Sequence, residues 1–239
     1  MKKIFFALII ASMLFTSCDI FERRIVGNGH TVTEKRNVHD TRSINLSGNF
    51  DVQLSPDSTA SLKIEADDNL LPYIVTDEEG GQLVIKAREH TSLDSRNGIK
   101  IFVAANKLEE ISISGAGSIV ATDKFTGSNK LALGISGAGS LHINVNTPKV
   151  IAHLSGVGSI DISGETKDAE IHISGVGNFK GNNLKAENVQ VQLSGTGSAN
   201  VFASTNLNVS ISGVASVNYS GNPTVSKSVS GMGSVNKVD

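Results

Sequence analysis

The sequence predicts an all-β protein, a parallel β-helix of about seven coils with a β cap at its N-terminal end. Three observations point to this solenoid fold. A Ser-Gly step recurs every 18 to 22 residues through the C-terminal half of the chain. Apolar and polar residues alternate with a period of two on both sides of that step, as they do in strands. No stretch of the repeat has the spacing of an amphipathic helix.

The repeat contains the motif S-G-x-G-S, with small variations. Its units begin at Ser114, Ser136, Ser155, Ser174, Ser194, Ser212 and Ser230. A unit of this length buries little by itself, so we expect successive units to stack about 4.8 Å apart as coils of one solenoid. Residues 111–239 are therefore expected to form the β-helix proper.

Three columns of the aligned repeat are expected to point into the core. The residue before the serine is Ile, Leu or Val in every coil, and the residue five after it is apolar throughout. The residue three before it is apolar in every coil except the last, where it is Lys227. Stacking turns each column into a continuous apolar ladder.

The glycines of the motif are expected at corners between strands. A sharp corner needs either positive φ or a close backbone approach that excludes a side chain. The serine hydroxyls next to the corner are expected to bond to neighbouring backbone groups. A phosphate-binding loop is disfavoured, because no helix follows the glycines and no Lys or Asp partner accompanies them.

The last coil breaks the apolar pattern with two lysines, Lys227 and Lys237. Lysine at the end of a stack discourages edge-to-edge association. We interpret this coil as a polar cap, with docking of a second chain, and hence a homo-oligomer, as the alternative.

The N-terminus carries the pattern of a bacterial lipoprotein. Lys2 and Lys3 precede an apolar run, Ile4 to Phe15, that is too short to span a bilayer. Phe15-Thr16-Ser17-Cys18 resembles a lipobox, and Cys18 is the only cysteine of the chain. We therefore predict a signal peptide over residues 1–17, lipidation of Cys18, a tether over residues 18–29 and an outer-membrane location, on the surface or the periplasmic face.

Residues 30–110 are predicted to form the N-terminal β cap and the first coils. This part is richer in charge than the repeat, yet it alternates in the same way over Ser43 to Leu54, Ser61 to Glu65, Gln82 to Arg88 and Gly98 to Val103. Solenoid ends need atypical, polar covers, which is the role expected of this segment.

Several stretches together resemble the putative auto-transporter adhesin, head GIN domain family. They are INLSGNFDVQLS, SLKIEADDNLLPYI, the Gly98 to Val103 strand leading into LEEISISGAGS, and the SGxGS array. The resemblance extends from about Val38 to the C-terminus. It implies a right-handed parallel β-helix in secreted lipoproteins of diderm bacteria, and it supplies no catalytic residues.

Composition excludes several function classes. The 239 residues carry a formal net charge of −2, which gives no electrostatic footprint for nucleic acid. A single cysteine cannot form a cysteine-rich zinc or iron–sulfur site. The acids of the repeat do not fall in adjacent coils of one column, so a polysaccharide-active enzyme is the least favoured class and no cofactor is expected.

Two groups of residues were weighed as metal sites. His153 and His172 fall in the same column of neighbouring coils and are expected to stack on the outer face, with His142 as a third candidate ligand for zinc or copper. Two imidazoles alone make a weak site, so solvated histidines are the simpler interpretation. The acids at Asp67-Asp68 and Asp77-Glu78-Glu79 are calcium candidates for which a solvated loop is the simpler interpretation.

Taken together, the sequence predicts a lipid-anchored envelope protein without catalysis, an adhesin or surface-binding module for a protein or glycan. The few aromatic residues argue against a stacking type of carbohydrate module. The alternative is a periplasm-facing structural or accessory lipoprotein.

Overall fold

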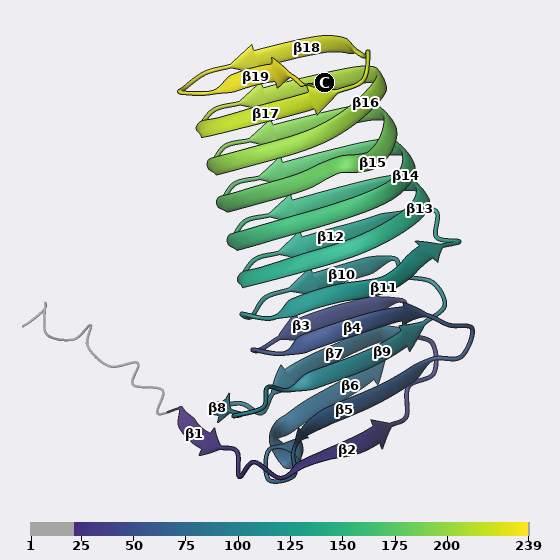
Figure 1. The fold of residues 1–239 in the computed structure, drawn as a ribbon, viewed down its shortest axis with the longest axis vertical. Helices are drawn as coiled ribbons and strands as arrows, with labels where there is room; N and C mark the ends of the chain where they lie inside the picture. The colour runs from purple at the N-terminus through teal and green to yellow at the C-terminus, as the bar shows by residue number, and fades with distance from the viewer. Residues whose placement is uncertain (1–21, 239) are drawn as a thin grey trace, which may run out of the picture.

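The computed structural model describes residues 22–238, and within them nearly the whole chain is β-structure. The strands stack into a tall parallel solenoid that stands on an antiparallel base (Figure 1). The only helical element among these residues is the single 3₁₀ turn η2 (Leu71–Tyr73). The predicted signal peptide and Cys18 lie outside the described residues.

The repeat forms the upper solenoid, in which each strand pairs in parallel with the coils below and above, except that β18 and β19 of the last coil pair only with the coil below. The register sets Leu141 beside Ile160, Ile160 beside Phe179 and Phe179 beside Ala199, which confirms the predicted columns. The strands are β10 (Glu110–Ile113), β11 (Ser118–Thr126), β12 (Leu131–Ile135), β13 (Ala138–Leu154), β14 (Val157–Ile173), β15 (Val176–Leu193), β16 (Thr196–Ile211), β17 (Val214–Ser220), β18 (Thr224–Val229) and β19 (Ser234–Lys237).

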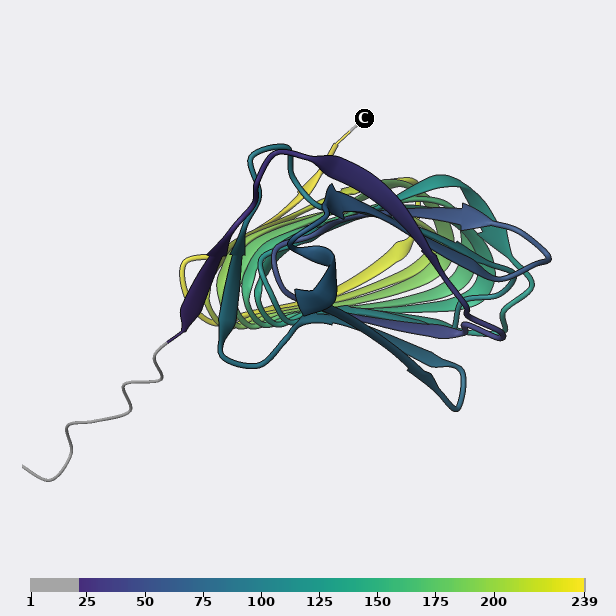
Figure 2. The same cartoon turned by 90° about the horizontal axis from the view of Figure 1, so that it is seen from below.

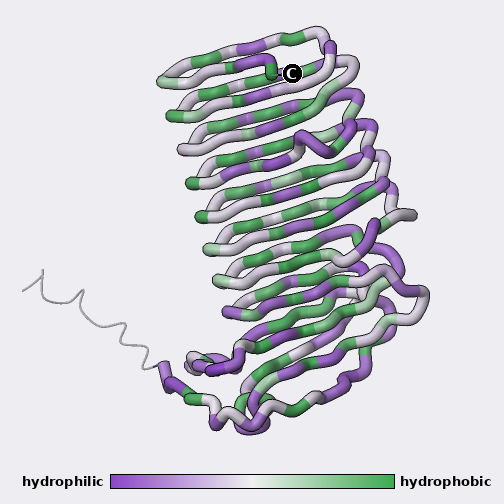
Figure 3. The backbone as a smooth tube through the Cα atoms, viewed as in Figure 1, coloured by the Kyte–Doolittle hydropathy of each residue, from purple (hydrophilic) through white to green (hydrophobic). Residues whose placement is uncertain are grey.

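The core fills the inside of the coils, because inward and outward residues alternate along each strand (Figure 3). The predicted apolar columns are almost completely buried from Ile113 to Ile211. Phe179 is the largest of these side chains, and Gly181 makes room for its ring two residues further on. Each buried Leu, Ile or Phe contributes about 1.5–3 kcal/mol, so the ladders hold the stack together.

One edge of the solenoid, here called the Ser–Gly edge, consists of the stacked S-G-x-G-S corners. The first glycines of the corners are Gly115, Gly137, Gly156, Gly175, Gly195, Gly213 and Gly231. A Cβ atom on any of them would lie within 3.0 Å of the backbone of the glycine below, closer than real Cβ atoms come. Glycine is therefore required at these corners because the two backbones approach closely. Positive φ is not the reason, since none of the first glycines from Gly137 to Gly213 has a positive φ.

Backbone hydrogen bonds continue around these corners. The Val157 N–H donates to the carbonyl of Gly137 at 2.9 Å, and the Val176 N–H donates to that of Gly156 at 3.0 Å. The expected serine hydroxyl bonds are largely wrong: of the corner serines that the structure describes, Ser114 alone donates its hydroxyl to a carbonyl, that of Leu46. The serine N–H groups make the corner bonds instead, as between Ser155 and Ile135.

An eighth Ser-Gly corner lies below the repeat, at Ser47-Gly48. Strands β3 (Ser43–Ser47) and β4 (Asp51–Pro56) flank it and pair in parallel with β10 and β11. A Cβ atom on Gly115 would overlap the backbone of Gly48, as at the corners above. Ser47 lies outside the uninterrupted repeat, because strands β5 to β9 come between β4 and β10 in the chain.

The chain segment between β4 and β10 forms most of the base, so the order of the coils in space differs from their order in the sequence. Strands β7 (Gln82–Ala87) and β9 (Lys100–Ala105) pair in parallel beneath β3 and β4. The base is then closed by antiparallel strands, which pair with β7, β9 and one another: β2 (Thr31–Arg36), β5 (Ser61–Asp67) and β6 (Ile74–Glu79).

The tether predicted over residues 18–29 ends earlier than expected. Strand β1 (Arg23–Val26) pairs in parallel with β8 (Thr91–Asp94), and Arg24 forms an ion pair with Asp94 at 2.5 Å. The predicted tether is therefore wrong for residues 23–29, which belong to the folded body. The sequence gives no local sign of this pairing, because its partner strand lies 68 positions further along the chain.

The last coil carries the two lysines where the repeat alignment placed them. Lys227 pairs with Val209, and Lys237 pairs with Tyr219 and donates to the Asn222 side chain at 2.8 Å. Both lysines are exposed, as is Val229, which continues a core column. The placement of the lysines agrees with the polar cap, which stays a prediction.

The corner glycines give a direct test of the stacking. Gly175→Ala should lower the free energy of unfolding by about 3 kcal/mol, because the new methyl group would overlap a backbone carbonyl that cannot move without breaking the ladder. Thermal and urea unfolding followed by circular dichroism measure the change.

The matched control is Gly134→Ala, on a strand of the same solenoid. Its Cβ atom would meet only Ser112, at 3.7 Å, which is an ordinary contact, and the φ of Gly134 is not positive. This variant should be as stable as the parent or slightly more so. Equal destabilisation of the two variants would contradict the account of the corners.

Candidate binding surface

The solenoid presents two broad faces to solvent. Seen along the stack, the coils form a flattened ring with two long sides (Figure 2). One long side, the histidine face, carries the outward residues of β10, β12, β18 and the C-terminal halves of β13 to β16. The other, the asparagine face, carries those of β11, β17, β19 and the N-terminal halves of β13 to β16.

A row of polar side chains crosses the middle of the histidine face. The register aligns His153, His172, Gln192 and Ser210 in consecutive coils. The rings of His153 and His172 stack with their centroids 4.8 Å apart and an interplanar angle of 14°, which confirms the predicted stacking. His172 Nδ1 lies 3.1 Å from the Gln192 side-chain oxygen, so the row is joined by contacts between coils.

The environment of His153 disfavours the charged form of its imidazole. Partial burial, together with the neighbouring imidazole of His172, lowers the pKa of His153 below its ordinary value, although Glu170 acts in the opposite sense. The amide oxygen of Gln192 accepts hydrogen bonds, so the contact with His172 Nδ1 fits a hydrogen bond donated by the imidazole.

A shallow hollow of about 270 Å³ lies beside this row. Its lining combines His172, Gln192 and Ser210 with the corner serines Ser174, Ser194 and Ser212. Imidazole, amide and hydroxyl groups both donate and accept hydrogen bonds. The hollow can therefore hold a polar group of a partner, such as a sugar hydroxyl or a peptide amide.

The third metal ligand proposed from the sequence, His142, does not join the pair. It lies on the asparagine face, 3.7 Å from an Asp161 oxygen, with the core between it and His153. Over residues 22–238 there is no group of three or more His, Cys, Asp or Glu side chains that can hold a metal ion. The three-histidine site considered above is therefore wrong.

The asparagine face carries a ladder of amides. Asn218 donates to Asn200 at 3.0 Å, and Asn236 donates to Asn218 at 3.3 Å. A second ladder, on the histidine-face side near the corner opposite the Ser–Gly edge, joins Asn206 to Asn188 and Asn188 to Asp168. The amide groups of both ladders are used on one another.

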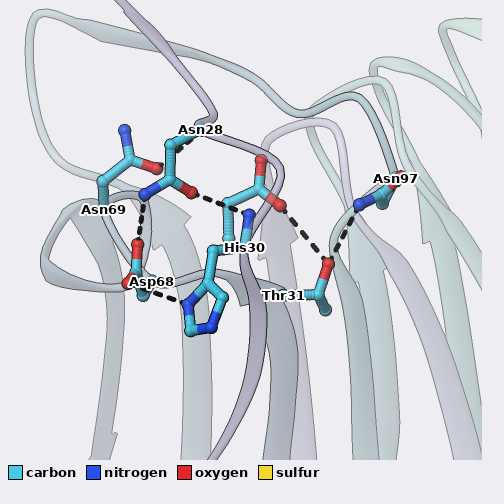
Figure 4. A network of polar contacts seen from close by, with 7 residues as sticks. Asn28, His30, Thr31, Asp68, Asn69 and Asn97 are labelled. Atoms are coloured by element: carbon cyan, nitrogen blue, oxygen red, sulfur yellow. Dashed lines mark hydrogen bonds and ion pairs between the residues drawn. The ribbon is translucent and has the colours of Figure 1, made fainter.

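The acidic candidates for calcium have protein partners instead. Asp68 accepts from Asn28 Nδ2 at 2.6 Å and contacts His30 Nδ1 at 3.1 Å, and these hydrogen bonds hold the pKa of Asp68 below its ordinary value (Figure 4). Asp67 is fully buried: one oxygen accepts from Thr31 at 3.4 Å, and the other packs against Gly27 without a hydrogen-bond partner. This network fastens the segment after β1 to the base.

Glu78 also has a structural role. Burial alone would raise its pKa, but hydrogen bonds from the Thr41 hydroxyl and the backbone N–H groups of His39 and Asp40 lower it below its ordinary value. The solvated-loop interpretation is therefore wrong for Asp67 and Glu78, whereas Asp77 and Glu79 are exposed on strand β6. Repeat acids are partnered too: Glu170 pairs with Lys149 at 2.6 Å.

One feature of the repeat was not recognised in the sequence, namely that an apolar residue x of the S-G-x-G-S motif is exposed. Val157, Val176, Val214 and Met232 occupy this position and are among the exposed large hydrophobic residues. The signal was present in the sequence, because x is apolar in six of the seven motifs although it lies at a corner.

Comparison with known proteins supports the fold and the family. A crystal structure of a putative adhesin from Bacteroides fragilis resembles the chain with 24% sequence identity and a TM-score of 0.85, and the match covers 90% of this chain and 100% of that one. A putative lipid binding protein from Parabacteroides distasonis matches with 25% identity and a TM-score of 0.75, over 91% of this chain and 100% of that one. A putative adhesin from the same species matches with 22% identity and a TM-score of 0.73, over 90% of this chain and 100% of that one. No curated protein matches.

A family description covers most of the folded body. The sequence model of the putative auto-transporter adhesin, head GIN domain, matches residues 41–223, from the first Ser-Gly coil to the start of the last coil. These residues contain all the stacked corners except the one at Ser230, and both broad faces except their last strands, β18 and β19. The chain therefore belongs to the putative auto-transporter adhesin, head GIN domain family.

Proposed function

We propose that the protein is a lipid-anchored adhesin of the bacterial envelope that binds a glycan or protein through its histidine face, without catalysis. The observation that carries this proposal is the row of His153, His172, Gln192 and Ser210 beside a shallow polar hollow. The stacked coils hold the row at a fixed spacing, so the groups that meet a partner are already ordered before binding.

The family and the structural neighbours support an adhesive role rather than a particular ligand. Aromatic platforms are scarce on the described surface, and Lys63 and Lys185 lie 4.0 Å over the rings of Phe102 and Phe202. Recognition would therefore use hydrogen bonds from imidazole, amide and hydroxyl groups.

Anchoring through Cys18 supplies the attachment to the envelope in this proposal. The described residues contain no helix long and apolar enough to cross a bilayer. The lipobox pattern supports anchoring, and several acyl chains on one cysteine hold a protein firmly, since each buried methylene contributes about 0.8 kcal/mol.

Replacing the lipidated cysteine tests the anchor. Cys18→Ala should move the protein from the membrane fraction to the soluble fraction, because the acyl chains have no other attachment point. Fractionation of cells, with incorporation of a labelled fatty acid in the parent chain, measures this. Unchanged partitioning of the variant would contradict the anchor.

Replacing the polar row tests the binding face. His172→Ala with Gln192→Ala removes two hydrogen-bonding groups worth about 0.5–1.5 kcal/mol each, so affinity should fall about tenfold. The probes are a glycan array and a panel of extracellular matrix proteins, followed by titration of whatever the parent protein binds.

The control for this test changes the other face. Asn178→Ala with Asn200→Ala removes two amides of the asparagine face and should leave binding unchanged. Equal loss in both variants, or loss in the control alone, would contradict binding by the histidine face. Absence of binding to every probe by the parent protein would count against an adhesin.

A further inference from the structure

We propose that the Ser–Gly edge faces the membrane, so that the solenoid lies along the bilayer on this edge. The inference rests on the lipid anchor at Cys18 proposed above, and it adds an orientation that the anchor alone does not give. Three observations carry it: an exposed apolar stripe, the absence of charge beside that stripe, and the point at which the chain leaves the folded body.

The apolar stripe follows the whole height of the repeat. The residues at position x of the corners are aligned by the register, and they include Val157, Val176, Val214 and Met232, which are 60%, 54%, 49% and 76% exposed. Ala116, Ala138 and Thr196 occupy the remaining coils and are exposed as well. At about 4.8 Å per coil the stripe is about 29 Å long.

Along the seven repeat corners, the columns on either side of the stripe are uncharged and hold serine, except for Asn178 at one position. In the coil below them, Asp51 continues one of these columns. The opposite edge of the same coils differs, because it carries the exposed residues Glu165, Lys167, Lys185 and Glu187. A neutral edge of apolar and hydroxyl groups can enter the interface of a bilayer without desolvating a charge, whereas the opposite edge cannot.

The chain enters the folded body at the foot of this stripe. Glu22 lines a hollow of about 460 Å³ together with residues of the lowest Ser-Gly corners, among them Gly48 and Ala116. Arg88 and Glu89 line the same hollow, so the foot of the edge is charged although the stripe above it is not. Figure 1 shows β1 on the same side of the solenoid as these corners. Glu22 is the fourth residue after Cys18, so an extended chain spans at most about 14 Å between them.

The first strand is fixed to the folded body. Pairing of β1 with β8 and the Arg24–Asp94 ion pair hold the first strand. The polar network beyond it adds bonds from the Asn28 N–H to Asn69 Oδ1 at 3.0 Å and from Asn69 Nδ2 to the Val26 carbonyl at 2.8 Å. An acylated Cys18 thus holds the foot of the Ser–Gly edge close to the bilayer, and the apolar stripe extends that contact along the solenoid.

This orientation determines which surfaces remain available. With the Ser–Gly edge on the lipid, the histidine face, the asparagine face and the charged edge project sideways and outward. The row at His153 and His172 then projects sideways, whereas Ser174, Ser194 and Ser212 of the hollow beside it belong to the edge that faces the lipid.

The experiment uses the acylated full-length protein in phosphatidylcholine vesicles. Cys18 is the only cysteine and is blocked by acylation, so a cysteine introduced elsewhere can be labelled alone with a nitrobenzoxadiazole fluorophore. Val176→Cys reports the Ser–Gly edge, and Lys167→Cys reports the opposite edge of a neighbouring coil. Both positions are exposed, so neither change should disturb the fold.

Iodide quenching of the label measures contact with water. In vesicles the label at residue 176 should be quenched at least threefold less than the label at residue 167, whereas without vesicles, in the Cys18→Ala background, the two should be quenched equally. Adding Val157→Ser and Val214→Ser should remove most of the protection at residue 176. Equal quenching at both edges in vesicles, or protection that survives these serines, would overturn the proposal.

Flotation of the vesicles separates this inference from the one on which it rests. If the protein does not float with the vesicles, the lipid anchor fails and the orientation fails with it. If the protein floats and residue 176 is quenched like residue 167, the anchor stands and only the orientation is overturned.

Discussion

The contact on which the fold depends is the passage of one backbone directly over another at the Ser-Gly corners. At each corner a glycine sits on the backbone of the glycine below, with no room for a Cβ atom between them. The backbone ladder therefore continues around the edge, and the apolar columns on both sides stay in register from coil to coil. The same geometry pushes residue x outward, so an exposed apolar stripe follows from how the edge is built.

The repeated half of the fold could be predicted from the sequence, because the repeat aligns every inward residue with its neighbour in the next coil. The positions of Phe179 and Lys227 followed from that alignment alone. The base could not be predicted in the same way. The chain between β4 and β10 separates Ser47-Gly48 from the next corner, and β1 pairs with β8, a strand far away in the sequence.

Part of the candidate site could be predicted from the sequence, because residues of one repeat column lie side by side in neighbouring coils. Stacking of His153 on His172 follows from a shared column, whereas the position of His142 on the other face excludes it from the pair. The hollow beside Gln192 depends on how side chains of three coils settle together. The acids Asp68 and Glu78 bind partners about 40 residues away in the sequence, which no local pattern reveals.

In the proposed arrangement the solenoid is a rigid scaffold whose surfaces have separate roles. The Ser–Gly edge faces the lipid, and the histidine face binds a partner. The measurement that tests it most directly is antibody labelling of intact cells, compared with lysed cells and with a periplasmic control protein. The account predicts labelling on intact cells, under conditions in which the control is reached only after lysis. Labelling that appears only after lysis, together with that of the control, would contradict an adhesive role and place its partners within the envelope.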